Sequence, residues 1–181
     1  MPKQVRAVIL CEDRQQEVFA RYFLTVCGIR PVRVQVSPSG IGSGEQFVRE
    51  NYPREVKTFR SKHPAQPDTR LVVLTDADVW YVGERYQQLD EALRENRLAI
   101  RQPQEHIGVF IPKRNIETWI YFLKGHPVNE EEAYPHLRKQ SECKPEVELL
   151  AQNRRNPVPE NAPPSLRDAC QELPRILTEN V

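Results

Sequence analysis

Four short apolar segments, each followed by a helical pattern, constrain the fold of this chain more than any other feature. The segments are rich in β-branched residues and lie at residues 5–11, 32–36, 70–75 and 107–111. Such runs are typical of buried strands. Apolar residues at helical spacing follow each of them, at residues 14–27, 45–61, 82–97 and 116–123. This order predicts an α/β fold with a mainly parallel four-stranded sheet and helices on both faces. Pro53 should kink or interrupt the second helix, because proline lacks a backbone donor.

The character of the chain changes after Gly125. We therefore expect an α/β domain over residues 1–125 and a helical, Pro-rich extension over residues 126–181. Residues 130–153 are charged and are expected to be helical. Further on, a short amphipathic stripe is formed by Leu166, Ala169, Cys170 and Leu173. Few large apolar residues lie in the extension, so it should pack either on the domain or on a partner protein.

Composition excludes several classes of protein. No apolar run approaches the roughly 20 residues of a membrane helix, and no small-residue cleavage site follows the N-terminal residues. The four cysteines lie far apart, and the four histidines show no ligand spacing. We therefore expect a cytoplasmic protein without a disulfide framework, a zinc site or a membrane partner. The net charge of +1 does not by itself indicate a nucleic-acid partner.

Acidic residues follow two of the predicted strands. Glu12 comes after the first strand, and Asp76 and Asp78 come after the third. In an open parallel sheet, ligands bind beyond the carboxyl ends of the strands. Carboxylate oxygens there suit Mg²⁺ or Mn²⁺, which would neutralise charge on a phosphodiester and activate a water. Glu12 could instead serve as a general acid or base, and the two aspartates could simply form a turn or a helix cap.

Three charged residues follow the fourth strand. Lys113 could hold a scissile phosphate or remain an ordinary surface cation. Arg114 is a candidate nucleic-acid contact beside it. Glu117 lies in the first turn of the next helix, where the helix dipole alone favours an acid. A place near the metal is its alternative role.

A basic helix face is the remaining candidate surface. Arg54, Lys57 and Arg60 are spaced three residues apart and should lie near one another on a helix. They could contact a phosphate backbone or form a solvated face.

These motifs together resemble the Toprim domain, found in topoisomerases, bacterial primases and OLD-family nucleases. The resemblance rests on a strand ending in Glu12, a later strand ending in Asp76-x-Asp78, and the βα order between them. The segment from Pro112 to Trp119 is similar to the P-x-x-x-I-E-x-W stretch of small stand-alone Toprim-like proteins, which often accompany ATPases in bacterial anti-phage systems. The likeness spans about residues 5–124, with further similarity near the C-terminus.

The resemblance implies a function. By that likeness Glu12 binds metal or acts as the acid/base group, Asp76 and Asp78 bind metal, Lys113 is the basic residue of OLD-like nucleases, and Glu117 is an additional acidic site residue. The chain would be a Mg²⁺- or Mn²⁺-dependent endonuclease or nicking subunit in antiviral defence. DNA is favoured over RNA as its substrate. Its implied partner is an ATPase, and a second copy of this chain is another candidate.

Two departures from the Toprim pattern keep other functions open. Asp13 stands where glycine is usual, and Gln16 stands where many Toprim domains carry a second acid. A non-catalytic module that binds or senses nucleic acid is one alternative, and a small phosphohydrolase is another.

Overall fold

The chain folds around a single parallel sheet. The computed structural model describes residues 4–177. Its strands are β1 (Arg6–Cys11), β2 (Arg30–Val36), β3 (Thr69–Leu74) and β4 (Ile107–Phe110). They pair in the order β2-β1-β3-β4, and every pairing is parallel. The predicted α/β fold is thus confirmed, with an all-parallel sheet.

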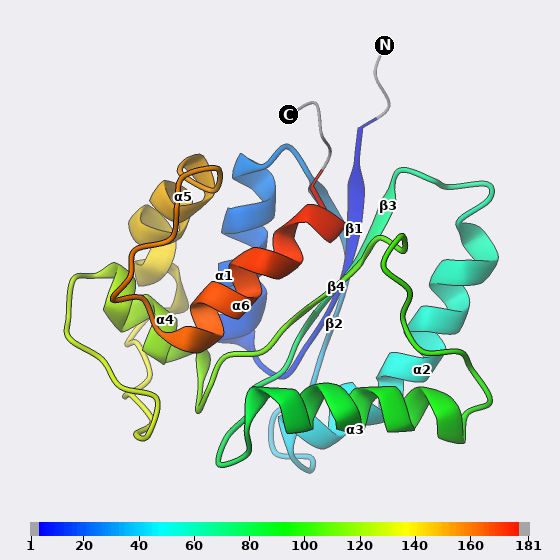
Figure 1. Cartoon of the computed structure of the whole chain (residues 1–181), viewed down its shortest axis with the longest axis horizontal. Coiled ribbons are helices and arrows are strands. Elements are labelled where there is room, and N and C mark those ends of the chain that lie inside the picture. Colours follow the sequence, from blue (N-terminus) through cyan, green and yellow to red (C-terminus); the bar gives the residue numbers. More distant parts are fainter. Residues whose placement is uncertain (1–3, 178–181) are drawn as a thin grey trace.

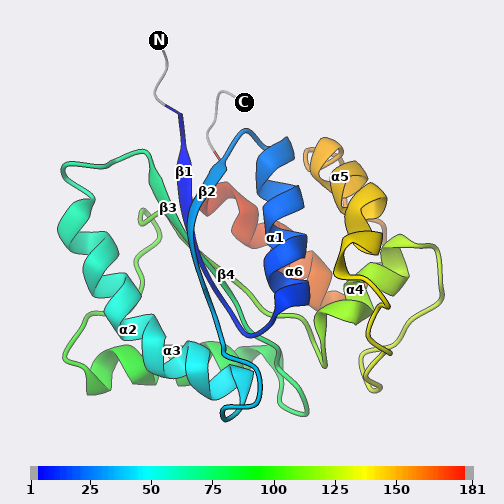
Figure 2. The same ribbon diagram turned by 180° about the vertical axis from the view of Figure 1, so that it is seen from behind.

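Helices cover both faces of this sheet (Figure 1). In the described residues they are α1 (Arg14–Val26), α2 (Gly44–Lys62), α3 (Val82–Glu95), α4 (Ile116–Leu123), α5 (Lys144–Gln152) and α6 (Pro164–Glu172). Two short 3₁₀ helices, η1 (Gln140–Cys143) and η2 (Leu173–Arg175), adjoin α5 and α6. One hydrophobic cluster joins the sheet to α1, α4, α5 and α6, and a second joins it to α2 and α3. Figure 2 shows the same two groups from behind.

The chain reverses its direction across the sheet between β1 and β3. After β1 it moves to β2 at one edge, and it then returns past β1 to β3 and β4. If every crossover has the usual right hand, α1 must lie on one face and both α2 and α3 on the other, as observed. The carboxyl ends of β1 and β3 therefore flank a topological switch point, where open α/β sheets bind ligands.

Strand position explains strand composition. The strands β1 and β3 lie inside the sheet, and nearly all of their side chains from Ile9 and Leu71 onward are buried. The edge strand β2 alternates valine with polar residues, and Val32 is 48% exposed. A central strand covered on both faces favours a continuous apolar run, whereas an edge strand tolerates alternating apolar and polar residues.

The C-terminal region completes one face of the core. Leu166 is 3% exposed and Leu173 is 9% exposed, and both belong to the cluster around α1. The indole of Trp119 donates a hydrogen bond to Ser165 Oγ at 2.8 Å. Arg70, on β3, donates to the carbonyl of Ile176 at 3.1 Å. Residues after 125 thus pack directly on the α/β domain.

Two local expectations were wrong in part, namely an interruption of the second helix at Pro53 and a helix over the whole of residues 130–153. The helix α2 runs through Pro53 without interruption, because Tyr52 and Val56 are fully buried on either side and hold both halves in the core. Residues 130–139 are not helical. There the side chain of Asn129 accepts from the backbone N–H groups of Glu131 and Glu132, a local bond that competes with helix formation.

Across the part of the chain that the structure describes, no helix has the length and apolar character needed to cross a bilayer.

The packing of α6 predicts a strong effect of a buried charge. Leu166→Asp should lower the free energy of unfolding by about 3–5 kcal/mol, because an uncompensated charge would enter the core. Arg167→Asp, at the neighbouring exposed position, should change it by less than about 0.5 kcal/mol. Chemical denaturation measures both values. Equal stability of the two variants would contradict the observed packing of α6.

Candidate functional site

The carboxylate of Glu12 reaches across from β1 to the end of β3. Its Oε1 accepts hydrogen bonds from Thr75 Oγ1 at 2.5 Å and from the backbone N–H of Asp76 at 2.7 Å. These strands are hydrogen-bonded neighbours in register from Arg6↔Thr69 to Leu10↔Val73, so residues just beyond their ends must adjoin. The structure therefore brings together Glu12 and Asp76, two of the three predicted metal ligands.

Gln16 connects the two acidic residues. Its side chain donates to Asp76 Oδ1 at 2.9 Å and accepts from the backbone N–H of Glu12 at 2.9 Å. Gln16 is fully buried on the first turn of α1. Asp13 caps this helix by accepting from the N–H of Gln16 at 2.8 Å. The amide thus fixes the orientation of Asp76, a role that was not predicted from the sequence.

Burial makes both carboxyl groups weak acids. It raises the pKa of Glu12 from 4.5 to about 7, although the bonds from Thr75 and Asp76 act in the opposite direction. Burial also raises the pKa of Asp76 well above its ordinary value, and the nearby Glu12 raises it further. Desolvation and like charge both disfavour the ionised forms. A divalent cation would remove this penalty.

Asp78 differs from this pair in its surroundings. Its backbone is left-handed, with φ of 53°, and it pairs with Arg114, which is also left-handed with φ of 68°. The side chain of Asp78 is 58% exposed, and its Oδ2 lies 3.7 Å from Arg85 Nη2. Burial raises the pKa of Asp78, while Arg85 and Arg114 lower it. Asp78 thus borders the site and faces cations.

Arg85 organises the loop that follows β3. Only 4% of its side chain is exposed, and its Nη1 lies 2.8 Å from Glu45 Oε1. Its Nε donates to the carbonyl of Asp76 at 3.0 Å. A buried guanidinium with these partners fixes the backbone on which Asp76 and Asp78 are carried. Nothing in the local sequence around Arg85 indicates this role.

Lys113 is engaged with the same loop. Its Nζ donates to the carbonyl of Asp78 at 3.2 Å and to the carbonyl of Trp80, and it lies 5.6 Å from the centre of the Tyr81 ring. An ammonium group has three donors, so one remains for a ligand. Lys113 therefore ties the β4–α4 connection to the β3–α3 loop.

Glu117 forms a separate pair with His136. Glu117 is 1% exposed, and its Oε1 lies 2.6 Å from Nδ1 of His136, whose side chain is 82% exposed. Burial raises the pKa of Glu117, and the hydrogen bond to Glu117 raises the pKa of His136. No hydrogen bond joins Glu117 to Glu12 or Asp76 in the described residues, and Glu117 is bonded to His136 instead.

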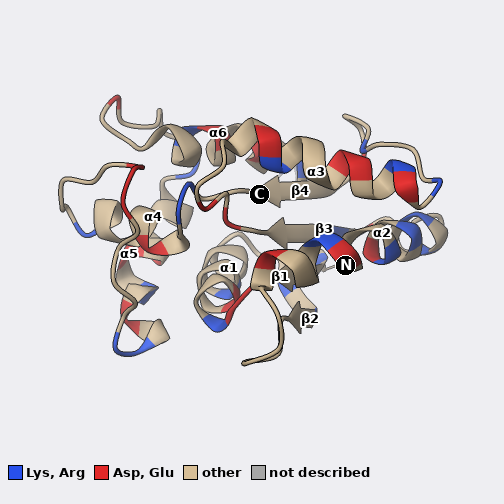
Figure 3. Cartoon of the chain, turned by 90° about the horizontal axis from the view of Figure 1, so that it is seen from below, with Lys and Arg blue, Asp and Glu red and all other residues tan. Residues whose placement is uncertain are grey.

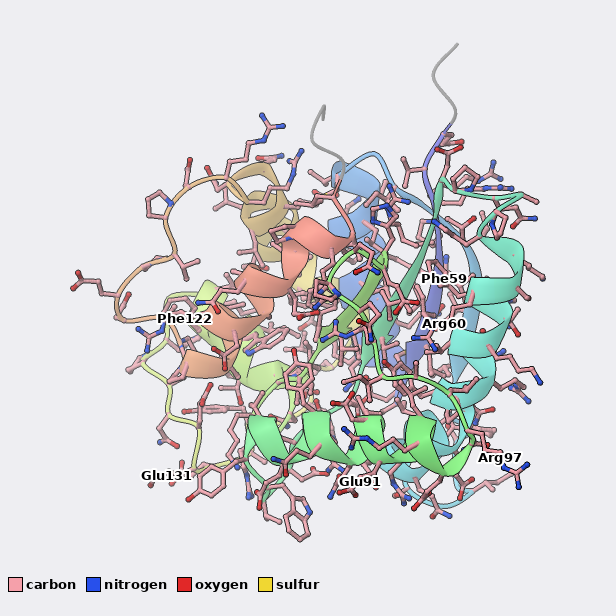
Figure 4. All side chains as sticks on the ribbon, turned by 45° about the vertical axis from the view of Figure 1, so that its right-hand side comes forward. Phe59, Arg60, Glu91, Arg97, Phe122 and Glu131 are labelled. Atoms are coloured by element: carbon pink, nitrogen blue, oxygen red, sulfur yellow. The ribbon has the colours of Figure 1, made fainter. Side chains whose placement is uncertain are left out.

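The three basic residues of α2 differ in their surroundings. Arg60 makes an ion pair with Glu105 at 2.6 Å and donates to the carbonyls of Ala99 and Ile100, so it is held against the segment before β4 (Figure 4). Arg54 and Lys57 are exposed. The structure therefore leaves two of the three predicted contacts on the open helix surface.

A pocket of about 390 Å³ opens beside Glu12, between the start of α1 and the loop after β2. Gly44 closes one side of it. A Cβ on Gly44 would lie 2.7 Å from Cβ of Glu12, so this position has no room for a larger residue. The loop after β2 is thereby held against the acidic pair.

Two of the three predicted ligands, Glu12 and Asp76, are placed to bind a hard cation. Within residues 4–177, no three His, Cys, Asp or Glu side chains are placed to share one metal ion. The partly buried Glu12 and the buried Asp76 offer oxygen donors only, which suits Mg²⁺ held by one or two carboxylates together with water and substrate phosphate. Asp78 would have to turn from Arg85 to join them.

Comparison with protein-family models, with curated proteins and with solved structures gives no match.

The raised pKa values predict an unusual dependence of stability on pH. A folded-state pKa above the unfolded value means that the folded chain binds more protons between pH 4.5 and about 7. The contribution of Glu12 is therefore fully present below pH 4.5 and is lost as the pH rises through about 7, by on the order of 1–3 kcal/mol. Denaturation at a series of pH values without metal measures this loss.

Glu12→Gln is the matched variant, because its amide oxygen can still accept from Thr75 and Asp76. It should be more stable than the wild type at pH 8 and should show a smaller loss between pH 4.5 and 7. Mn²⁺ should stabilise the wild type at pH 8 far more than at pH 5. An unchanged pH profile in the variant would refute the assigned environment of Glu12.

Proposed function

We propose that this chain is a Mg²⁺- or Mn²⁺-dependent nuclease with a Toprim-like core, which cleaves phosphodiester bonds, with DNA as the favoured substrate. The observation that carries the proposal is the juxtaposition of Glu12 and Asp76 at the switch point of a parallel sheet. Buried carboxylates with raised pKa values at such a place are candidates for catalysis.

The arrangement assigns a part to each residue. Glu12 and Asp76 would hold the cation, which supplies charge neutralisation and an activated water when bound. Gln16 holds Asp76 in a fixed orientation. With a pKa near 7, Glu12 can also accept or give up a proton at physiological pH. The remaining donor of Lys113 can contact a phosphate oxygen near Asp78.

The setting of this activity is also proposed. The segment from Pro112 to Trp119 resembles that of small proteins that accompany ATPases in anti-phage systems, so an ATPase is the partner we favour. A cytoplasmic location is proposed from the four cysteines, which lie far apart in the sequence. Association with a second copy of this chain is compatible with the resemblance.

One observation favours a non-catalytic module instead. Gln16 occupies Asp76 Oδ1 with a hydrogen bond, and Asp78 is directed to Arg85. Fewer free carboxylate oxygens weaken a two-metal site. A chain of this kind would bind nucleic acid in a salt-dependent manner without cutting it.

The second alternative is a small phosphohydrolase. The pocket beside Glu12 is large enough for a small phosphorylated substrate.

A cleavage assay tests the proposal. The wild type in Mn²⁺ should nick or linearise supercoiled plasmid, and Glu12→Gln and Asp76→Asn should each reduce the rate by about 10²-fold or more, because each removes a charged site oxygen. Agarose gels with time points give the rates, and added chelator should stop the reaction.

The matched controls are Glu91→Gln on the exposed face of α3 (Figure 4) and Asp168→Asn on α6. They make the same chemical changes away from the site and should cleave at the wild-type rate. Cleavage that survives both site variants would refute the proposal. Salt-sensitive binding without cleavage would support the non-catalytic module.

A further inference from the structure

Two aromatic side chains are exposed in the segment that follows Asp76. They lie in the loop between β3 and α3, where Tyr81 is 75% exposed and Trp80 is 48% exposed. Trp80 follows Asp76 by four residues, which places it within ~14 Å along the chain. Single exposed apolar side chains are ordinary, but a contiguous exposed group can mark a binding site, and Val79 beside these rings is 72% exposed. Neither ring belongs to either hydrophobic cluster of the core.

The loop presents these rings on a fixed backbone. Lys113 donates to the carbonyl of Trp80, and the N–H of Trp80 donates to the carbonyl of Ala77 at 2.9 Å. The N–H of Tyr81 donates to Glu84 Oε2 at 2.8 Å as α3 begins. Ala77 is itself bonded to the carbonyl of Pro112 at 2.8 Å. The backbone that carries the rings is thus held in place, which lowers the entropic cost of binding a ligand.

The surrounding charge suits a nucleotide. The ammonium group of Lys113 lies 5.6 Å from the Tyr81 ring centre, and the next residue, Arg114, is held beside the same loop by a backbone bridge to Asp78. A ring surface next to cations matches a nucleobase joined to a phosphate. Protein partners usually bury about 800 Å² on each side, which two rings cannot supply.

Charge distribution favours a single strand over a duplex. Figure 3 views the molecule from the side toward which the strands run, and acidic and basic segments are interspersed there along α2 and α3. Duplex binding relies on many cations along the phosphate backbone. Stacking on aromatic rings instead requires bases that are not already stacked inside a duplex.

We propose that Trp80 and Tyr81 form a stacking platform for unpaired bases of a nucleic-acid strand whose backbone passes the Glu12–Asp76 pair. This inference rests on the proposed nuclease function and narrows its substrate to single-stranded nucleic acid or to unpaired regions of a duplex.

Tryptophan fluorescence gives a direct test. The chain has two tryptophans, and Trp119 is 2% exposed and bonded to Ser165. A ligand that stacks at the loop should therefore quench Trp80 alone. The probe is a thymidine oligonucleotide of about 12 residues, within the ~4–16 nucleotides of known single-strand sites. It is titrated without metal into the Glu12→Gln protein, which prevents cleavage.

We expect saturable quenching, which Trp80→Phe abolishes while leaving the affinity within about threefold, because phenylalanine still stacks. In an anisotropy assay with a labelled probe, Trp80→Ala should raise the Kd about tenfold, and the double variant with Tyr81→Ala about 10²-fold, since each stacked base contributes ~1–3 kcal/mol. Leu149→Ala is the control, because Leu149 is 58% exposed on α5 and should leave the Kd unchanged.

Three outcomes would overturn the platform. The first is an unchanged Kd in the double alanine variant. The second is that this variant loses affinity equally for a duplex of the same length. The third is that this variant loses self-association while its oligonucleotide binding is unchanged. The last outcome would make the loop a protein interface. Because binding is measured without metal, quenching of Trp80 without any plasmid cleavage would retain the platform and remove the nuclease.

Discussion

The hydrogen bonds from Thr75 and Asp76 to Glu12 are the contact around which the site is arranged. They join the carboxyl ends of two neighbouring parallel strands at the point where the chain reverses across the sheet. The strands are buried, and at their ends Asp76 is buried and Glu12 is partly buried. Desolvation then raises their pKa values, and the folded chain gains from a proton or a cation placed between them.

The loops around this contact are held by cations. Arg85, on α3, donates to the carbonyl of Asp76, and Lys113, in the β4–α4 connection, donates to the carbonyl of Trp80. Arg85 also makes an ion pair with Glu45, and in the described residues neither cation makes an ion pair with Glu12 or Asp76. The two cations therefore do not compensate the charge of the acidic pair, while they hold in place the β3–α3 loop that carries Trp80 and Tyr81.

The fold and the centre of the site were predictable because both depend on strand order. Apolar runs revealed the four strands, and residues that follow parallel strands must meet at one edge, which placed Glu12 and Asp76 together. The roles of Gln16, Arg85 and His136 were not predictable, because each depends on a partner distant in the sequence. Asp78 turns away through a left-handed backbone, and Arg60 is held by Glu105. The spacing of residues in the sequence reveals neither the backbone conformation of Asp78 nor the ion pair of Arg60.

Anomalous diffraction from crystals soaked in Mn²⁺ tests the central claim most directly. The account predicts one strong peak within ~2.0–2.6 Å of a carboxylate oxygen of Glu12 and one of Asp76, and no such peak in crystals of Asp76→Asn. Waters should complete the coordination. A peak at another cluster of residues, or an empty Glu12–Asp76 pair at saturating Mn²⁺, would contradict the assignment of this pair as the metal centre.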